Sequence, residues 1–282
     1  MMAETEAKWL LRTGKHSLEL GNLTRIMGIL NVTPDSFSDG GSYLQPEAAV
    51  DRAFAMAAEG ADIIDVGGES TRPGSAEVGL EEELKRILPV IRALSQSPLN
   101  KPVSVDTYKA EAARQALEAG AHILNDIWGG KRDPNMLKVA AEYSCPIVLM
   151  HNRRDMSYGD FLTDVVKDLL ESVELARRAG VRDENIILDP GIGFAKTHEH
   201  NLIMMANLDR ITGLGFPVLL AASRKSSIRK VLELPADDVV EGTVATTVLG
   251  IAQGVSLVRV HDIQPNKRAA QMADAVRHFR LG

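Results

Sequence analysis

The sequence predicts a single-domain (β/α)8 barrel with a short N-terminal β-hairpin, and three observations support this prediction. Eight short β-type runs recur along the chain, and each is followed by a helical stretch. The first residues of successive runs lie about 33 residues apart on average, which is the length of one βα unit. Most of the runs are apolar throughout, as parallel strands covered on both faces are. A doubly wound open sheet is the alternative, but it would usually have fewer strands.

The predicted strands are short, and almost every one finishes in a polar or charged residue directly after apolar ones. They are Ile26–Val32, Asp62–Gly68, Pro102–Thr107, Ile123–Ile127, Pro146–His151, Asn185–Gly191, Pro217–Ser223 and Leu257–Asp262. Active sites of such barrels lie at the carboxyl ends of the strands. The polar residues at these ends are therefore the candidates for function.

The predicted helices are amphipathic and rich in alanine, leucine and glutamate. They are Pro46–Glu59, Leu80–Leu94, Ala110–Ala119, Asn135–Tyr143, Phe161–Ala179, Asn201–Thr212, Glu241–Gln253 and Pro265–Phe279. Glycines 60, 120 and 180 follow three of them and are typical stop signals. Before the barrel, Trp9–Gly21 has Gly14–Lys15 between two apolar runs, which predicts a hairpin over the barrel bottom. We expect residues 1–22 to form this extension and residues 23–282 the barrel.

Composition limits the class of protein. The 282 residues carry a formal net charge of −6, so a general nucleic-acid binder, which needs a basic face, is not expected. No apolar run is long enough to span a membrane, and the charged Met1–Leu10 lacks the apolar stretch of a signal peptide. The lone Cys145 can form neither an internal disulfide nor a cysteine zinc site and is expected in the core. These features predict a cytoplasmic protein without a membrane partner.

Two chemically distinct groups stand at the predicted strand ends. Asp106, Asn125 and Asp189 are acceptors, and a pair of carboxylates with an amide suits a planar heterocycle rich in N–H donors. The same three residues also fit a divalent metal site or a glycosidase-like acid/base pair of carboxylates. The donors are Arg72, Lys225, Arg259 and His261. Cations that converge on one rim of an acidic protein indicate an anionic substrate, and a phosphate or pyrophosphate fits them best.

Two other segments carry possible functional signals. The polar, glycine-rich stretch Asn31–Gly41 follows the first barrel strand, is long for a βα loop, and suggests a lid. The run His198–Glu199–His200 resembles a metal motif, but alternate residues of a helix point to different faces. We expect these histidines to be solvated residues at a helix start.

Motifs spread over nearly the whole chain resemble the dihydropteroate synthase family. The most specific are Met27–Gly41 (MGILNVTPDSFSDGG), Asp62–Gly74 (DIIDVGGESTRPG) and Ser223–Ser226 (SRKS). The others, in the same order as in the family, are Ser104–Thr107 (SVDT), Asn125–Ile127 (NDI), Leu149–His151 (LMH), Leu188–Lys196 (LDPGIGFAK) and Arg259–Asp262 (RVHD). The chain departs from the usual pattern at Ala195, Ala221 and Ala222, where glycine is frequent.

The resemblance implies a folate-biosynthesis enzyme that is a sulfonamide target and commonly a homodimer. It would join 7,8-dihydropterin-6-ylmethyl diphosphate to 4-aminobenzoate and release pyrophosphate, with Mg2+ as cofactor. The implied pterin-binding residues are Asp106, Asn125, Met150, Asp189, Lys225 and Arg259, and the implied diphosphate-binding residues are Asn31, Arg72, Arg259 and His261. Asn31 would also be associated with Mg2+. The implied aminobenzoate pocket is Thr71, Pro73, Phe194 and Ser226, and the implied catalytic residues are Lys225, Asp39 and Arg72.

An SN1-like substitution without a covalent enzyme intermediate fits these residues, because cations and Mg2+ would neutralise the departing diphosphate. A pterin-binding methyltransferase that uses methyltetrahydrofolate is an alternative that shares the barrel and the acceptor pocket. A catalytically silent pterin-binding subunit is another. The cationic set directed at a diphosphate argues against the first, and the complete set of donors and acceptors argues against the second.

Overall fold

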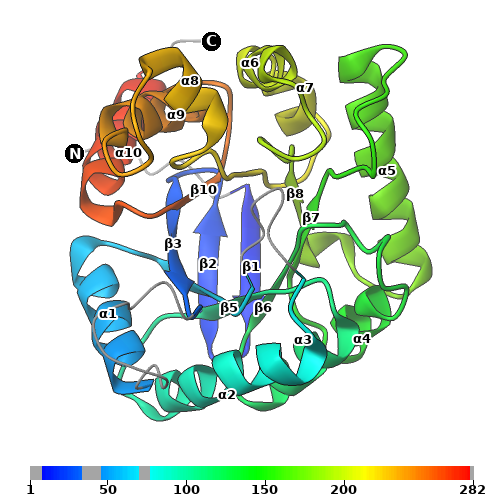
Figure 1. Ribbon diagram of the computed structural model, residues 1–282, viewed down its shortest axis with the longest axis vertical. Helices are drawn as coiled ribbons and strands as arrows, with labels where there is room; N and C mark the ends of the chain where they lie inside the picture. The colour runs from blue at the N-terminus through cyan, green and yellow to red at the C-terminus, as the bar shows by residue number, and fades with distance from the viewer. Residues whose placement is uncertain (1–7, 34–45, 70–76, 280–282) are drawn as a thin grey trace.

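The computed structural model describes residues 8–33, 46–69 and 77–279, and within these ranges an eight-stranded parallel sheet forms the centre of the molecule (Figure 1). Its strands are β3 (Arg25–Asn31), β4 (Ile63–Gly67), β5 (Val103–Asp106), β6 (Ile123–Asp126), β7 (Ile147–Met150), β8 (Ile186–Asp189), β9 (Leu219–Leu220) and β10 (Leu257–Val260). Each lies inside or within one residue of its predicted range. All of them except β3 are shorter than predicted, because the residues at the ends of the predicted ranges leave the hydrogen-bonded ladder.

The sheet closes on itself. The strand order is β8-β7-β6-β5-β4-β3-β10-β9, with parallel pairing throughout. The two ends of this order are joined by a parallel bridge between Leu188 and Val218, and the Leu188 amide donates to the Pro217 carbonyl at 2.9 Å. The predicted (β/α)8 barrel is therefore confirmed, and the open-sheet alternative is wrong.

Helices surround the barrel on its outer side (Figure 1). They are α1 (Pro46–Glu59), α2 (Leu80–Gln96), α3 (Ala110–Glu118), α4 (Met136–Glu142), α5 (Phe161–Arg178), α6 (His198–Ala206), α7 (Asp209–Thr212), α8 (Ser226–Leu232), α9 (Val240–Ala252) and α10 (Ile263–His278), with a 3-10 turn, η2, at Asp183–Asn185. All three predicted glycine stops follow these helices in the left-handed region, at φ 110°, 112° and 97° for glycines 60, 120 and 180. Each of these glycines thus ends a helix where a side chain would be strained.

The helices differ from the predicted ones in two places. The single helix predicted over Asn201–Thr212 is two helices, because Asn207 leaves helical geometry at φ −131° and ψ 37° and separates α6 from α7. The helix α8 was not predicted at all. It spans only seven residues and ends at Glu233 in the left-handed region, so its sequence is too short to show a clear helical period.

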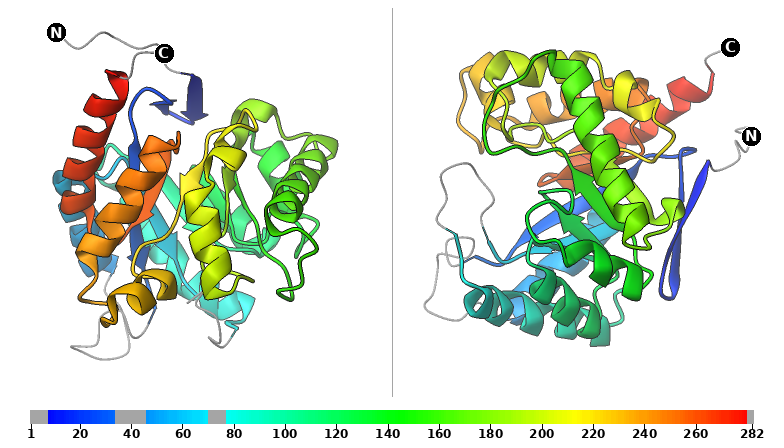
Figure 2. Two further views of the ribbon diagram at one scale, coloured as in Figure 1. Left: turned by 90° about the horizontal axis from the view of Figure 1, so that it is seen from above. Right: turned by 90° about the vertical axis from the view of Figure 1, so that its right-hand side faces the viewer.

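The N-terminal hairpin seals one end of the barrel, as predicted. Strands β1 (Trp9–Thr13) and β2 (His16–Leu20) pair antiparallel and lie across the end that is remote from the carboxyl ends of the barrel strands (Figure 2). Leu11 and Leu20, both almost fully buried, pack with residues such as Met27, Ile63 and Leu257 inside the barrel. Each fully buried side chain of this size contributes about 1.5–3 kcal/mol of hydrophobic stabilisation. The other end, where the carboxyl ends of the barrel strands lie, is not covered by the hairpin and is available for a functional site.

A second, larger core lies between the barrel wall and the helices. Met56 of α1, with Ile87 and Ile91 of α2, are completely buried there against strand residues such as Ile64 and Val66. Cys145 belongs to the same core, as predicted. Among the described residues, no helix is long and apolar enough to cross a membrane.

Candidate active site

Seven of the side chains that the sequence indicates lie at the carboxyl ends of the barrel strands. They are Asn31 on β3, Asp106 on β5, Asn125 on β6, Met150 on β7, Asp189 on β8 and Arg259 on β10, with His261 directly after β10. Asp39, Thr71, Arg72 and Pro73, and the greater part of the expected lid Asn31–Gly41, lie outside the described residues.

Arg259 joins two carboxylates at the mouth of the barrel. Its Nε atom donates to Asp65 Oδ2 at 2.6 Å, and its Nη2 atom donates to Asp106 Oδ2 at 2.7 Å. The Asp65 side chain is fully buried and that of Asp106 is 5% exposed. The planar fork of guanidinium donors is what allows one side chain to hold both carboxylates. Arg259, expected as a donor, and Asp106, expected as an acceptor, thus form one cluster.

The carboxylates of this cluster keep acceptor capacity. Oδ1 of Asp65 and Oδ1 of Asp106 are buried and have no hydrogen-bond partner among the described residues. Burial raises the pKa of Asp106 to about 7, against the attraction of Arg259 and with the repulsion of Asp65. A buried acceptor without a partner costs about 1–3 kcal/mol. A ligand that supplies N–H donors would remove that cost.

Asp65 was not assigned a role from sequence, although the signal was present. It stands between Ile64 and Val66 just as Arg259 stands between Val258 and Val260, and a charge inside an apolar strand needs a partner. Asp65 Oδ2 also accepts from Asn125 Nδ2 at 3.2 Å. This bond directs the amide nitrogen of Asn125 toward Asp65, and so its oxygen is available to act as an acceptor elsewhere.

Asp189 ends β8 and begins the loop of residues 190–197. Its Oδ1 atom accepts from the Gly191 amide at 2.7 Å, which folds the chain back beside the carboxylate. Gly191 is in the left-handed region at φ 70°, and a Cβ there would lie 2.0 Å from the His151 carbonyl oxygen. Burial raises the pKa of Asp189, and Lys225 opposes the shift by attraction. Asp189 and Lys225 are thus close enough to attract each other, so an acceptor and a donor lie in one site.

Lys225 is the N-cap residue of α8, and its side chain extends to this loop. Its Nζ atom donates to the Ile192 carbonyl at 2.5 Å and lies 4.7 Å from the centre of the Phe194 ring. Burial lowers the pKa of Lys225 to about 8, while the attraction of Asp189 opposes that shift. Gly193 is in the left-handed region at φ 85°, and a Cβ there would lie 3.0 Å from Lys225 Cδ. The lysine is thus confined to one path into the site.

An apolar wall stands beside the polar groups. Tyr108, Ile127 and Met150 form a buried cluster, and the partly buried Trp128 and Phe194 pack against it. The turn that carries Trp128 is fixed by Asp126, which accepts from the Trp128 amide at 2.9 Å and the Gly130 amide at 2.6 Å. Acceptors on one side and a flat apolar surface on the other suit a planar aromatic ligand with polar edges.

The loops after β9 and β10 are tied together. Ser223 Oγ lies 3.0 Å from His261 Nδ1 and accepts from the His261 amide at 3.2 Å. Arg224, in the left-handed region at φ 58°, donates to both oxygens of Asp262 at 3.0 and 2.6 Å. These bonds hold Lys225 and His261 on the same rim as Arg259. Ser226 begins α8 on this rim as well.

Asn31 lies beside Asp106. A Cβ built on Gly67 would lie 3.5 Å from Asn31 Oδ1 and 3.6 Å from Asp106 Cβ, so both side chains stand over the same glycine. A hard amide oxygen next to a buried carboxylate fits Mg2+, which takes one or two protein oxygens and completes its shell with substrate phosphates and waters. No group of three His, Cys, Asp or Glu side chains suited to a metal occurs in the described part of the chain.

A buried polar group that sequence reasoning left without a role lies behind the loop of residues 190–197. Lys196 Nζ is 2.8 Å from His151 Nδ1, and His151 Nε2 is 3.1 Å from Asp168 Oδ2. The sequence shows His151 as the polar end of the LMH motif and Lys196 as the polar end of the LDPGIGFAK motif. The solvated placement expected for His198–Glu199–His200 is wrong for His200, which stacks on Phe161 with ring centres 4.3 Å apart.

Comparison with known families and curated proteins gives a consistent result. The sequence pattern of the family described as "Pterin binding enzyme" matches residues 27–261. A dihydropteroate synthase of Clostridium beijerinckii is 54% identical over 267 residues, which cover 94% of this chain and 99% of the relative. The dihydropteroate synthase of Bacillus subtilis is also 54% identical, over 95% of this chain and 93% of the relative.

Solved structures agree in fold and sequence. A dihydropteroate synthase from Clostridium difficile, crystallised in the presence of pteroic acid, has a TM-score of 0.90 and 47% identity over 93% of this chain and 99% of that one. The Xanthomonas albilineans dihydropteroate synthase with 4-aminobenzoic acid has a TM-score of 0.90 and 41% identity over 97% and 99%. A Yersinia pestis dihydropteroate synthase in complex with a sulfonamide drug has a TM-score of 0.88 and 38% identity over 95% and 99%.

Proposed function

The chain belongs to the pterin-binding enzymes and, within them, to the dihydropteroate synthase family of transferases, and from this premise we propose what each part of its site does. The reaction joins 7,8-dihydropterin-6-ylmethyl diphosphate to 4-aminobenzoate and yields 7,8-dihydropteroate and pyrophosphate. One observation carries the assignment of the site. Buried acceptors (Asp106, Asn125 and Asp189) and cations (Lys225 and Arg259) share one mouth of the barrel beside an apolar wall.

The pterin ring binds among the acceptors. The oxygens of Asp106, Asn125 and Asp189 accept from its N–H groups, and the ring lies against Met150. The buried Oδ1 atom of Asp106, which lacks a partner among the described residues, supports this role. Lys225 reaches the ring beside the loop after β8, where its Nζ atom donates to the carbonyl of Ile192 and lies 4.7 Å from the centre of the Phe194 ring.

The diphosphate binds on the cationic rim. Arg259 and His261 from the last strand, with Asn31 and Arg72, receive its oxygens. The Arg259 guanidinium is fixed by two carboxylates before substrate arrives, so little reorganisation is needed when the negative charge on the leaving group grows. The ties Ser223–His261 and Arg224–Asp262 keep this rim in place.

Bond cleavage precedes bond formation. The C–O bond between the methylene and the diphosphate breaks, and its electron pair leaves with pyrophosphate. The remaining cation is delocalised into the pterin ring and stabilised by the nearby carboxylates. The amine of 4-aminobenzoate then attacks the methylene, a C–N bond forms, and one amine proton is released. Thr71, Pro73, Phe194 and Ser226 hold the aminobenzoate, and Asp39 and Arg72 close over the reacting groups.

Mg2+ is part of this proposal, with Asn31 as its protein ligand. When bound, the ion supplies positive charge that neutralises the oxygens of the departing diphosphate. The position of Asn31 Oδ1 beside Asp106, over Gly67, supports the assignment.

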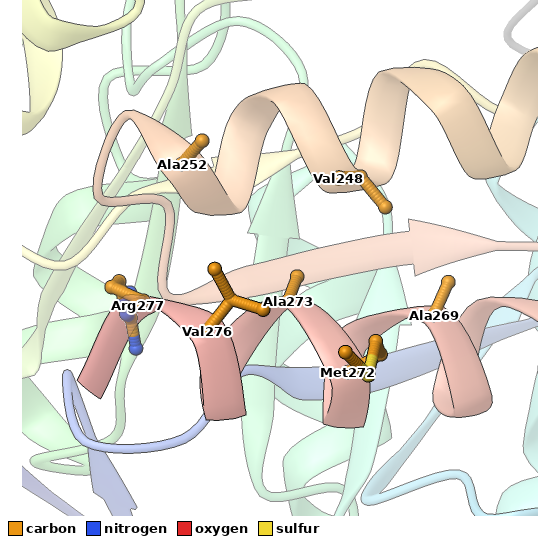
Figure 3. A pocket seen from close by; sticks show the side chains of 7 residues that line it. All are labelled: Val248, Ala252, Ala269, Met272, Ala273, Val276 and Arg277. Atoms are coloured by element: carbon orange, nitrogen blue, oxygen red, sulfur yellow. The ribbon is translucent and has the colours of Figure 1, made fainter. Parts of the chain in front are cut away.

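We propose that the enzyme is a homodimer. The outer face of α9 and α10 supports this, because an apolar groove runs between the two helices, lined by Val248, Ala252, Ala269, Met272, Ala273, Val276 and Arg277 (Figure 3). Met272 is 65% exposed and Val276 is 57% exposed. An apolar surface of this kind suits the face of a second copy. We further propose that residues 1–22 form a hairpin extension and residues 23–282 the catalytic barrel. We also propose a cytoplasmic location for the enzyme.

Pyrophosphate release tests the proposed function. The purified chain is mixed with the pterin diphosphate and Mg2+, with and without 4-aminobenzoate. We expect release of pyrophosphate together with dihydropteroate when both organic substrates are present. Pterin binding by calorimetry without pyrophosphate release would favour the methyltransferase or the silent binder, and methyl transfer from methyltetrahydrofolate to a corrinoid would separate these two.

A further inference from the structure

The loop after β8, residues 190–197, positions Lys225. The contacts that fix the conformation of this loop therefore affect catalysis. Lys225 contacts it at two points, the carbonyl of Ile192 and the ring of Phe194. The loop contains two left-handed glycines and the left-handed Ala195, at φ 44°. A backbone with three such residues at alternate positions, 191, 193 and 195, needs further hydrogen bonds to keep one shape.

Those bonds involve Lys196 of the loop itself, Tyr158 before α5 and Asn201 of α6. Lys196 Nζ donates to the Phe194 carbonyl at 3.2 Å and to His151 Nδ1 at 2.8 Å. The Tyr158 hydroxyl donates to the Ala195 carbonyl at 2.8 Å, and Asn201 Oδ1 accepts from the Gly193 amide at 2.6 Å. Lys196 is the charged member of this set and is only 7% exposed.

His151 is itself held in one tautomer. A carboxylate can only accept, so the contact of His151 Nε2 with Asp168 Oδ2 places the proton on Nε2. Nδ1 is then the acceptor that receives the Lys196 bond. Arg153 Nε donates to the same Asp168 oxygen at 2.5 Å and fixes the carboxylate in turn. The order of contacts runs from Arg153 through Asp168 and His151 to Lys196 and the loop.

We propose that Lys196 is a positioning residue for the arylamine end of the site, and that His151 and Asp168 hold it in place. This inference rests on the proposed function. Through the Phe194 carbonyl, Lys196 sets the place of the Phe194 ring, and through the loop it sets the Ile192 carbonyl that receives Lys225. Lys196 is thus expected to govern 4-aminobenzoate more than the pterin, because Asp106, Asn125 and Arg259 are fixed by other contacts.

The burial of Lys196 is itself a reason to assign it a function. A buried lysine costs free energy that a methionine of similar length would avoid. Burial lowers the pKa of Lys196 to about 7, with Lys225 and Arg153 lowering it further and Asp189 and Asp168 opposing the shift. In either protonation state the nitrogen retains two N–H donors, enough for the bonds to His151 and Phe194.

The test compares Lys196→Met with the wild-type enzyme in steady-state assays of both substrates. Loss of a buried bond from a charged donor corresponds to roughly a tenfold effect or more. We expect KM for 4-aminobenzoate to rise about tenfold, with a fall in kcat, while KM for the pterin diphosphate stays within about threefold. Lys167→Met is the matched control, because Lys167 is exposed and adjacent to Asp168 in α5; it should behave as wild type.

His151 provides a second comparison that does not depend on the folding of Lys196→Met. His151→Asn keeps an acceptor near the position of Nδ1, whereas His151→Leu removes it. We expect the leucine variant to reproduce the selective rise in KM for 4-aminobenzoate and the asparagine variant to recover most of the loss. Equal KM values in folded Lys196→Met and wild type, or equal effects on both substrates, would overturn the inference. Absence of turnover in the wild type would instead count against the proposed function.

Discussion

Arg259 Nη2 lies 2.7 Å from Asp106 Oδ2, although 153 positions separate the two residues in the chain. The contact joins a residue of the third barrel strand in the sequence to one of the last. Because Asp65 binds the same guanidinium through Nε, the cation cannot swing toward either carboxylate alone. The site is therefore arranged before any ligand binds.

Arg259→Lys tests that arrangement. A lysine keeps the charge but presents a single nitrogen, so it cannot hold both carboxylates and also meet a diphosphate with the same geometry. We expect the affinity for the pterin diphosphate to fall by about 10- to 100-fold, as for loss of a charged hydrogen bond. Calorimetry measures this directly. Arg268→Lys, at an exposed position of α10, is the control and should bind normally.

Asp189→Asn removes one acceptor while it keeps the size of the side chain. The amide that replaces the carboxylate has one acceptor oxygen, which the Gly191 amide already occupies in the present structure. We expect a loss of pterin affinity of roughly 1.5–3 kcal/mol. Competition binding with a pterin that lacks the diphosphate measures the loss without a contribution from the cationic rim. Unchanged affinity would place the ring elsewhere, and Asp237→Asn, at an exposed position, serves as the reference.

Lys225→Ala is expected to abolish turnover and to weaken the binding of both substrates, because Lys225 contacts the loop that carries Phe194 and is coupled to Asp189. The pH profile gives a second readout. The pKa of Lys225 in the free protein is about 8, so its charge is present below that pH and is lost as the pH rises through it. The binding of pterin diphosphate should therefore weaken above about pH 8. Near-wild-type kinetics of the alanine variant would contradict the role of Lys225.

Much of the fold was predictable because its signals are local. Apolar strands, helical periods and glycine stops are each read within about 20 residues. The same reasoning explains the errors. The α8 helix is too short for a period, and the break at Asn207 depends on contacts with Gln253, which accepts from the Leu208 amide at 2.8 Å.

The site was predictable as a set of residues and not as a set of contacts. Strand ends identified Asp106, Asn125, Asp189 and Arg259, because a barrel brings those ends together. That Arg259 bonds to Asp65 and Asp106 could not be read from spacing, since it depends on which inward positions face each other across the barrel. The bond between Lys196 and His151 likewise requires the loop geometry set by Gly191.

His122 gives a prediction for the stability of the hairpin end. Its ring lies against that of His16 with centres 5.0 Å apart, and its Nδ1 atom accepts from the Val103 amide at 3.2 Å. Burial, with repulsion from His16 and Lys15, lowers the pKa of His122 from 6.5 to about 4. Between these pH values the unfolded chain binds a proton at His122 that the folded chain does not. The stabilisation is thus complete above about pH 6.5 and is lost as the pH falls toward 4.

The experiment compares the stability of a His122 variant with that of the wild type at each pH. This comparison is needed because Asp106 and Asp126 change the stability in the opposite direction as the pH falls. Burial raises the pKa of these carboxyls to about 7 and about 6, so on their own they favour the folded state as the pH falls. His122→Asn keeps an acceptor near Nδ1 and removes the titration. Urea unfolding from pH 7.5 to 5 should show the variant gaining stability relative to wild type as the pH falls, since only the wild type must exclude that proton. A difference that does not change with pH would mean that His122 is protonated in the folded protein, with the Val103 amide bonded elsewhere.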